Sequence, residues 1–258
     1  MNFSELDRYL DSIAPLSLQE GWDNSGWQIK TGSENFSRIL VALDITDEVI
    51  EEAAAKKCEL IVTHHPMYFS PLKAIRDDAI YGRYTINLIQ AGISVYSTHT
   101  PFDIAEGGNN DHLGKVLGIE NIRTMPSDEL RLARIGELKE PVTVREFAHH
   151  ASEALNVDIG FFNLAGKPTD MVSRIGWCTG AGAEYIPAAK SCGCDLFITG
   201  DLKYHAALDA AAIDMNVLDL GHYATEIIFV DNMSEKLLSI EGIEVFKSEA
   251  HKNPFAII

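Results

Sequence analysis

The stretch Cys58-Glu59-Leu60-Ile61-Val62-Thr63-His64-His65-Pro66 decides how the fold of this chain is interpreted. Its apolar run over 60–62 has the length and composition of a short buried strand. A strand that ends in two histidines and a proline carries imidazoles into the loop at its carboxyl end, where ligands collect in open α/β sheets. Adjacent side chains leave the backbone in different directions, so His64 and His65 suit two different ions, or one ion and a substrate, better than a core.

The sequence on either side of this stretch predicts a doubly wound α/β arrangement. Apolar runs over 39–43 and 93–96 are expected to form neighbouring strands, and helices are expected over 46–57 and 80–91. This alternation of strands and helices is typical of a parallel sheet. The later strand leads into Ser97-Thr98-His99-Thr100-Pro101-Phe102-Asp103, so a third histidine and a carboxylate are expected at the same edge of the sheet.

A polar segment from Asn121 to Glu129 is interpreted as the boundary between two α/β domains. The first comprises residues 1–125, joined by the C-terminal segment 240–258, and the second comprises residues 126–239. The second half repeats the alternation of strands and helices. Its stretch Thr179-Gly180-Ala181-Gly182 either seats an anion at a helix N-terminus or permits close packing of strand and helix. The predicted fold class is therefore α/β with mostly parallel sheets.

A strand predicted over 217–220 ends at Gly221, and the helix that follows it begins with His222. Glu226 stands four residues later, so both side chains share one helix face and can bind one ion together. Helical His–Glu pairs are also ordinary surface contacts worth only a few tenths of a kcal/mol. The position of this pair directly after a strand and a glycine favours ligation.

The bulk composition limits the classes of function. The 258 residues carry 38 acidic and 21 basic side chains, a formal charge of −17, which disfavours general nucleic-acid binding. No apolar run approaches the ~18 residues of a membrane span, and the N-terminus lacks the basic and apolar blocks of a signal peptide, so a cytoplasmic protein is expected. The four cysteines follow no Cys-x-x-Cys pattern and are interpreted as reduced thiols.

Three strand ends supply candidate metal ligands, which are His64, His65, Asp103, His222 and Glu226. Three imidazoles and two carboxylates are too few for two closed sites. They suit two ions that share bridging carboxylates and keep open positions for water or substrate. Nitrogen and oxygen ligands without sulfur favour two divalent ions of zinc, iron or manganese over calcium. The pair His149-His150, in contrast, falls inside a predicted helix and is interpreted as surface histidine.

Several motifs occur in the order that is found in one protein family. The chain resembles the Nif-three-like (YbgI-type) family, whose members are often named GTP cyclohydrolase I type 2 homologues, in His64-His65-Pro66, His99-Thr100-Pro101-Phe102-Asp103, Gly200-Asp201-Leu202-Lys203-Tyr204-His205, and Gly221-His222 with Thr225-Glu226. The loop Trp22-Asp23-Asn24-Ser25-Gly26 is also similar to the family's N-terminal motif, but Trp27 stands where the family has a smaller aliphatic residue. By itself, this loop is either packed by its tryptophans or forms a wall of the site.

The resemblance covers nearly the whole chain, and it implies two interlinked α/β domains with a dinuclear metal site in the cleft between them. It implies that the five candidate residues are the ligands, with Asp103 and Glu226 as the bridges. It further implies a ring-shaped homohexamer, built as a trimer of dimers, whose sites face an inner cavity. The short segment 121–139 leaves no room for the extra domain that some relatives carry.

This constellation favours a metal-dependent hydrolase. Two ions lower the pKa of a bridging water far below that of bulk water, to about 7, which makes hydroxide available at neutral pH. We expect His99 or His205 to act as an acid–base partner or to orient a ligand. The family name implies a small-molecule substrate, a nucleotide, with attack of water on C8 of the guanine of GTP. A phosphoester or an amide is attacked by the same chemistry.

Two other interpretations stay open. A non-enzymatic metal-binding scaffold or regulatory protein would use the same ligands and present its ring to other proteins, and the acidic surface fits it. Alternatively, the histidines are loop groups satisfied by hydrogen bonds, although the agreement of three strand ends argues against this interpretation.

Overall fold

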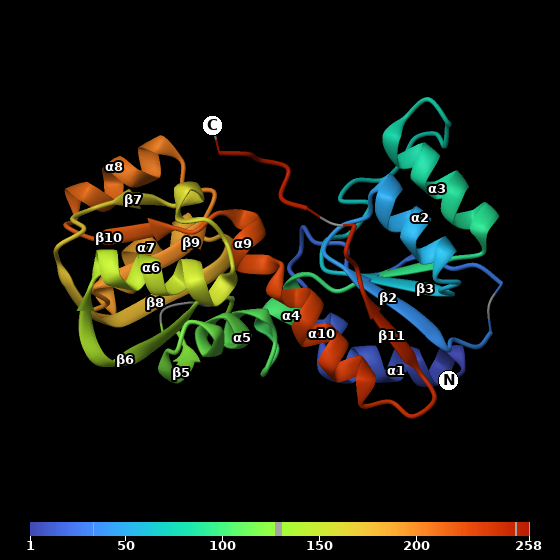
Figure 1. Ribbon diagram of the computed structural model, residues 1–258, viewed down its shortest axis with the longest axis horizontal. Coiled ribbons are helices and arrows are strands. Elements are labelled where there is room, and N and C mark those ends of the chain that lie inside the picture. The colour runs from blue at the N-terminus through green and yellow to red at the C-terminus, as the bar shows by residue number, and fades with distance from the viewer. Residues whose placement is uncertain (33, 127–130, 251, 258) are drawn as a thin grey trace. The chain divides into compact units, whose positions relative to one another are not determined.

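The computed structural model describes residues 1–32, 34–126, 131–250 and 252–257, and the chain divides into two compact units (Figure 1). The first unit comprises residues 1–105 and 229–254, and the second comprises residues 106–228 and 255–258. The sequence pattern predicts these boundaries near residues 125 and 239. The difference arises because residues 106–125 form a helix and a strand of the second unit. The Ser127-Asp128-Glu129 part of the expected boundary lies outside the described residues.

The sheet of the first unit carries the predicted parallel strands. Within the described residues it has five strands in the order β1-β4-β3-β2-β11, and every pair except β1–β4 is parallel. The strands are β1 (Gly26–Ile29), β2 (Arg38–Ala42), β3 (Leu60–Thr63), β4 (Ser94–Ser97) and β11 (Glu244–Lys247). Ala42, Thr63 and Ser97 are aligned across β2, β3 and β4, so the residues that follow these strands leave the sheet at one edge.

Helices cover both faces of this sheet (Figure 1). They are α1 (Phe3–Ile13), the 3-10 turn η1 (Leu16–Leu18), α2 (Asp47–Ala55), α3 (Ile80–Ala91), α4 (Thr100–Ile104) and α10 (Ile228–Leu238). Asn2 caps α1 in a capping box with Glu5, and Thr46 caps α2. Gly92 ends α3 in the left-handed conformation, with φ of 69°. The Tyr9 hydroxyl of α1 donates to the Lys236 carbonyl of α10 at 2.6 Å, which ties the two ends of the chain together within this unit.

The second unit contains a mixed sheet. Its described strands are in the order β5-β6-β8-β9-β10-β7, in which β8, β9 and β10 run parallel and the flanking pairs run antiparallel. These strands are β5 (Glu120–Thr124), β6 (Arg134–Thr143), β7 (Asn163–Ala165), β8 (Met171–Ala181), β9 (Leu196–Gly200) and β10 (Asn216–Asp219). Over the described parts of both sheets, parallel pairs outnumber antiparallel ones, which confirms the predicted fold class.

The helices of the second unit differ from expectation at two places. They are α5 (Asn109–Val116), α6 (Val144–Leu155), η2 (Ile159–Phe161), η3 (Ala183–Tyr185), α7 (Ile186–Ser191), α8 (Tyr204–Ala212) and α9 (His222–Glu226). The helix expected from His222 onward is interrupted after Glu226, and α10 continues from Ile228. The glycines of Thr179-Gly180-Ala181-Gly182 predict a turn before a helix, but Thr179, Gly180 and Ala181 form the end of β8.

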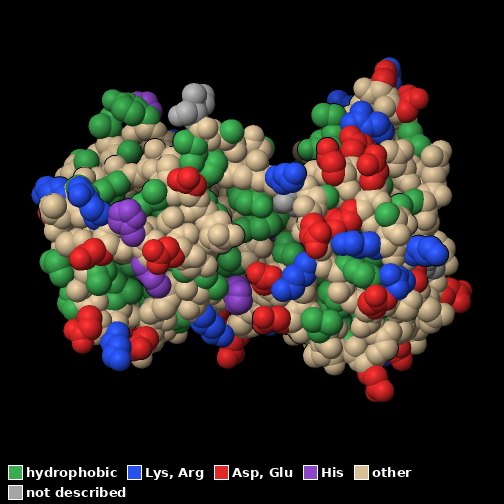
Figure 2. Space-filling model, in the orientation of Figure 1, with side chains coloured by type: hydrophobic (Ala, Val, Ile, Leu, Met, Phe, Trp, Pro, Cys, Tyr) green, Lys and Arg blue, Asp and Glu red, His purple; other side chains and the backbone are tan. Residues whose placement is uncertain are grey.

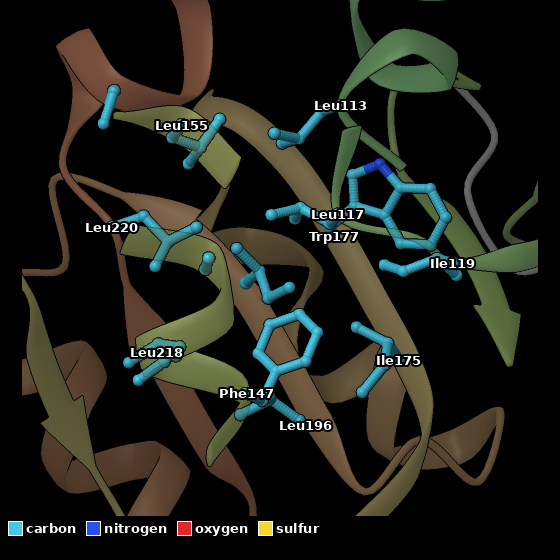
Figure 3. Close-up of a cluster of buried hydrophobic side chains, with 14 of the residues drawn as sticks. Leu113, Leu117, Ile119, Phe147, Leu155, Ile175, Trp177, Leu196, Leu218 and Leu220 are labelled. Atoms are coloured by element: carbon cyan, nitrogen blue, oxygen red, sulfur yellow. The ribbon is translucent and has the colours of Figure 1, made fainter. Parts of the chain in front are cut away.

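The core of the second unit fixes the strands that end near the candidate site. Figure 3 shows Phe147 and Leu155 of α6 lying against apolar side chains of the sheet, among them Ile175, Leu196 and Leu218. These side chains are buried. Burial of a large apolar side chain stabilises the fold by about 1.5–3 kcal/mol, so the helix is held firmly on β8, β9 and β10.

Charged side chains of both signs are interspersed over the face of the molecule drawn in Figure 2. On this face the acidic side chains therefore lie among basic ones. Among the helices of the described residues, none has both the length and the apolar character needed to cross a membrane.

Candidate metal centre

Three histidines of the first unit gather at the carboxyl edge of its sheet. His64 and His65 directly follow β3, and His99 lies two residues after the end of β4. The three rings are 5.0–5.4 Å apart between centroids, and one ligand nitrogen of each lies within 4.8 Å of the others. The parallel register of β3 and β4 produces this proximity, because neighbouring parallel strands end at the same edge.

Each of these imidazoles has its Nδ1 atom held by an oxygen. The Nδ1 atom of His65 lies 2.8 Å from Asp44 Oδ1, and that of His64 lies 3.1 Å from the Thr98 carbonyl oxygen. The Nδ1 atom of His99 lies 3.0 Å from Asp23 Oδ1. A carboxylate or carbonyl oxygen only accepts, so Nδ1 of each ring carries a proton, and Nε2 is the ring atom that can serve as a metal ligand.

Asp103 brings a carboxylate to the same edge from α4. Its Oδ2 atom lies 3.6 Å from His64 Nε2, and the residue is 5% exposed. The helix begins directly after His99 and places Asp103 one turn along. The sequence predicts a histidine and a carboxylate at the end of one strand. In the structure the histidine follows the strand, and the carboxylate belongs to the one-turn helix that comes after it.

The second unit presents a histidine–glutamate pair on α9. His222 Nε2 lies 2.8 Å from Glu226 Oε2, and His222 Nδ1 lies 2.8 Å from Asp201 Oδ2. Glu226 is 2% exposed. Gly180 permits this burial, since a Cβ atom at Gly180 would lie 2.2 Å from Glu226 Oε1. Of the two interpretations of the Gly180 stretch, the structure supports close packing of strand and helix.

The loop that contains Asp23 forms a wall of the histidine cluster. The Asp23 carboxylate accepts hydrogen bonds from the hydroxyls of Ser25 and Thr100 at 2.8 and 2.6 Å, in addition to the one from His99. Burial raises the pKa of Asp23, but the hydrogen bonds from His99, Thr100 and Ser25 outweigh it and lower this pKa to about 2. The Trp22 ring also meets the His99 ring edge-on at 5.5 Å.

Trp27 has a structural role in this unit. Its Nε1 atom donates to Asp7 Oδ1 at 2.7 Å, and its ring packs against Phe3, Phe36 and Tyr96. The larger residue at this position therefore fills the layer between α1 and the sheet.

The remaining histidines singled out from the sequence lie elsewhere on their unit. His205 is exposed on α8, where its ring meets Tyr204 edge-on at 5.4 Å, and it forms no hydrogen bond or ion pair with any residue that the structure describes. His149 and His150 are exposed on α6, and His150 Nε2 lies 3.2 Å from the Leu117 carbonyl oxygen. This placement agrees with the interpretation of His149-His150 as surface histidine.

The donor atoms within each unit fit a transition-metal ion. Imidazole nitrogens and carboxylate oxygens are the ligands that zinc, iron and manganese share, and a charged group buried at this edge needs a partner. Cys58 and Cys194 do not compete as ligands, because burial raises the pKa of their thiols to about 11 and keeps them protonated. No disulfide joins any of the four cysteines within the described residues.

Sequence reasoning named Asp23 as a hydrogen-bonding group of a possible site wall, but it did not pair Asp23, Asp44 or Asp201 with the histidines that they hold. Asp44 and Asp201 were available from the sequence, because each comes just after a buried strand, β2 or β9. The rule that located the histidines would have located them too. Asp23 precedes β1, and its approach to His99 follows from the antiparallel β1–β4 pairing, which the sequence does not reveal.

Comparison with known proteins gives consistent matches along the whole chain. A family model described as Duf34/NIF3 (NGG1p interacting factor 3) matches residues 1–254. The GTP cyclohydrolase 1 type 2 homolog of Clostridium perfringens is 36% identical over 264 aligned residues, which cover 100% of both chains. A Helicobacter pylori protein named GTP cyclohydrolase 1 type 2 is 34% identical, with 98% of both chains covered.

Solved structures agree with these matches. A hypothetical protein of Staphylococcus aureus superposes with a TM-score of 0.93 at 27% identity, covering 100% of this chain and 99% of that one. A Bacillus cereus protein related to NIF3 superposes with a TM-score of 0.91 at 24% identity over the same shares, which shows a common fold. These findings confirm the resemblance noted in the sequence motifs.

The Asp23 hydrogen bonds predict a pH-dependent contribution to stability. The folded-state pKa of Asp23 is about 2, below its ordinary value of 3.8, so ionised Asp23 stabilises the fold above about pH 4 and this contribution is lost as the pH falls through about 2. Asp23→Asn should lower the free energy of unfolding by roughly 2 kcal/mol at neutral pH, and the difference should shrink towards pH ~2.

Urea denaturation at a series of pH values measures this difference. The exposed Asp77 provides the control, since Asp77→Asn should leave the free energy of unfolding unchanged. A difference between Asp23→Asn and the wild type that stays constant down to the acid limit would contradict the explanation.

Proposed function

The chain belongs to the Duf34/NIF3 family, and from this premise we propose that it is a metal-dependent hydrolase whose ions are held by His64, His65, Asp103, His222 and Glu226. The observation that carries the proposal is the set of imidazoles whose Nδ1 atoms are held by oxygens, at His64, His65 and His222. This arrangement is typical of metal-bound histidines, because the oxygen fixes the tautomer and makes the other nitrogen more basic.

We assign two divalent ions of zinc, iron or manganese to each subunit. Asp103 and Glu226 are the ligands that we propose would be shared between the two ions, since a carboxylate can serve more than one cation. When bound, the ions supply an activated water at neutral pH. The five side chains come from both units, and the proposal requires them to act on the same pair of ions.

His99 is the residue that we assign to proton transfer. It donates Nδ1–H to Asp23, so Nε2 can accept a proton from water, and the Asp23 carboxylate stabilises the resulting imidazolium. Ser25 and Thr100 hold Asp23 in place through its second oxygen. His205 is left out of this proposal because its side chain is exposed and forms only a ring contact among the described residues.

The substrate that we propose is a small molecule, with GTP as the first candidate. The names of the relatives from Clostridium perfringens and Helicobacter pylori favour a GTP cyclohydrolase reaction, for which the family resemblance implies attack of water at C8 of the guanine. The ligand set itself specifies an activated water rather than its target, so a phosphoester or an amide is the alternative substrate. A non-enzymatic metal-binding scaffold or regulatory protein is the alternative in another class of function.

Metal content tests the proposed ligands. Asp103→Asn and Glu226→Gln should each remove at least one of the two ions, since a carboxamide cannot bridge. Asp44→Asn should weaken ion binding by about 10–100-fold, because His65 loses the group that fixes its ring. Elemental analysis of protein purified without chelator measures this, and the exposed Glu48 of α2 supplies a matched control in Glu48→Gln. Unchanged ion content in Asp103→Asn and Glu226→Gln would refute the assignment.

Turnover tests the hydrolase. The metal-loaded protein should hydrolyse GTP or a member of a phosphoester and amide panel, and His99→Gln should lower kcat by about 10²–10⁴-fold with ion content preserved. Turnover of a phosphoester or amide without turnover of GTP would discard the cyclohydrolase reaction. If Glu226→Gln removes the ions and no substrate class loses turnover, the scaffold replaces the hydrolase.

The oligomeric state is a further part of the proposal. The family resemblance favours a homohexamer built as a trimer of dimers, with its sites facing an inner cavity. Light scattering coupled to size-exclusion chromatography should therefore give the mass of six chains. A stable monomer or dimer at micromolar concentration would contradict this assembly.

A further inference from the structure

A cavity lies beside the histidine cluster of the first unit. Its volume is about 630 Å³, within the range of small-molecule pockets, and its lining comes from the Asp23 loop, β1, the loop after β3, and α3. Phe69 connects the cavity to the cluster. Its ring lines the cavity and lies 5.7 Å from the His99 ring and 6.5 Å from the His65 ring, between centroids.

The walls of this cavity are mainly apolar. Phe69, Leu72, Ile75 and Ile89 all line it, and all four are exposed in the folded chain. Four large apolar side chains exposed around one hollow indicate a binding surface, because a protein gains nothing from leaving them in water. The aromatic face of Phe69 and the branched side chain of Ile89 suit a flat ring.

Three polar side chains supply directional contacts. Asn24 Nδ2 donates to the Tyr68 carbonyl oxygen at 2.6 Å, while Asn24 Oδ1 accepts no hydrogen bond from any described residue. Ser70 forms no hydrogen bond within the described chain. Lys30 forms no ion pair there, and its Nζ atom lies 4.2 Å from the centroid of the Phe3 ring. Asp23 also lines the cavity, but its carboxylate is occupied by Ser25, Thr100 and His99.

We propose that this cavity binds the ring system of the substrate, a flat heteroaromatic ring with an amino or N–H group that donates to Asn24 Oδ1. Lys30 is the one lining cation among the described residues. The cavity therefore suits a neutral or singly charged part of the ligand, because a polyphosphate would need more positive charge. The ring binding rests on the cavity alone. We further propose that the bond of the substrate that reacts points past Phe69 towards His65 and His99, and this part rests on the proposed function.

Fluorescence titration with 2-aminopurine riboside tests the proposal, because stacking on Phe69 quenches this probe. The wild-type protein should quench it saturably. Ile89→Asp should weaken binding at least about tenfold, since the ring would have to desolvate a carboxylate. Ile80 is the matched control, because it lies on the same helix, is 58% exposed against 56% for Ile89, and does not line the cavity. Ile80→Asp should leave the affinity unchanged.

A second variant tests the role of Asn24. The wild-type protein should prefer 2-aminopurine riboside over purine riboside, which lacks the amino group, and Asn24→Leu should abolish that preference. A loosened loop alone would weaken both ligands equally, so the ratio of affinities isolates the hydrogen bond.

Three results would overturn the inference. The first is the absence of saturable quenching by the wild-type protein. The second is an equal loss of probe affinity in Ile80→Asp and Ile89→Asp. The third is a change of oligomeric state in Ile89→Asp when the wild-type protein binds no probe, which would identify the cavity as a contact between subunits. Ion content, measured on the same variants, should stay at the wild-type level. Probe binding without turnover of any substrate would contradict the proposed hydrolase and support the cavity assignment. Turnover without probe binding would support the hydrolase and contradict the cavity assignment.

Discussion

The structure depends on one constraint, which is that each imidazole of the candidate site has the proton of its Nδ1 atom fixed by an oxygen. Asp44, Asp23 and Asp201 provide this oxygen for three histidines, and the Thr98 carbonyl provides it for His64. The ring orientation, and with it the direction in which Nε2 points, is therefore set by the fold itself. A site built in this way has little to reorganise when a ligand arrives, and so its donor atoms hold their geometry.

The sheets position these pairs. In the first unit the aligned ends of β2, β3 and β4 carry Asp44, His64 and His99 to one edge, so both members of the Asp44–His65 pair come from adjacent strands. In the second unit the ends of β9 and β10 do the same for Asp201 and His222. Secondary structure and chemistry are thus coupled, because a slip in strand register would separate each acid from its histidine.

Much of this arrangement was predictable from the sequence, because it follows from strand ends. His64, His65 and His222 were located by apolar runs that stop at a histidine, and the α/β class followed from the alternation of strands and helices. The limits of the two units were not predictable, since the pairing of β5 with β6 is antiparallel and has no signature in composition. The role of Asp23 depends on the antiparallel pairing of β1 with β4, and the cavity beside it depends on β1 and α3 approaching each other in space. Local sequence patterns carry no such information.

The closing strand of the first sheet has a consequence for the chain during its synthesis. Glu244 of β11 pairs with Arg38 of β2, although the two are separated by 206 positions in the sequence. On the ribosome the outer edge of β2 therefore stays uncovered until nearly the whole chain has emerged, roughly 10–40 s at ordinary elongation rates. An uncovered edge attracts other strands, so the nascent polypeptide is a natural client for a holding chaperone during that interval.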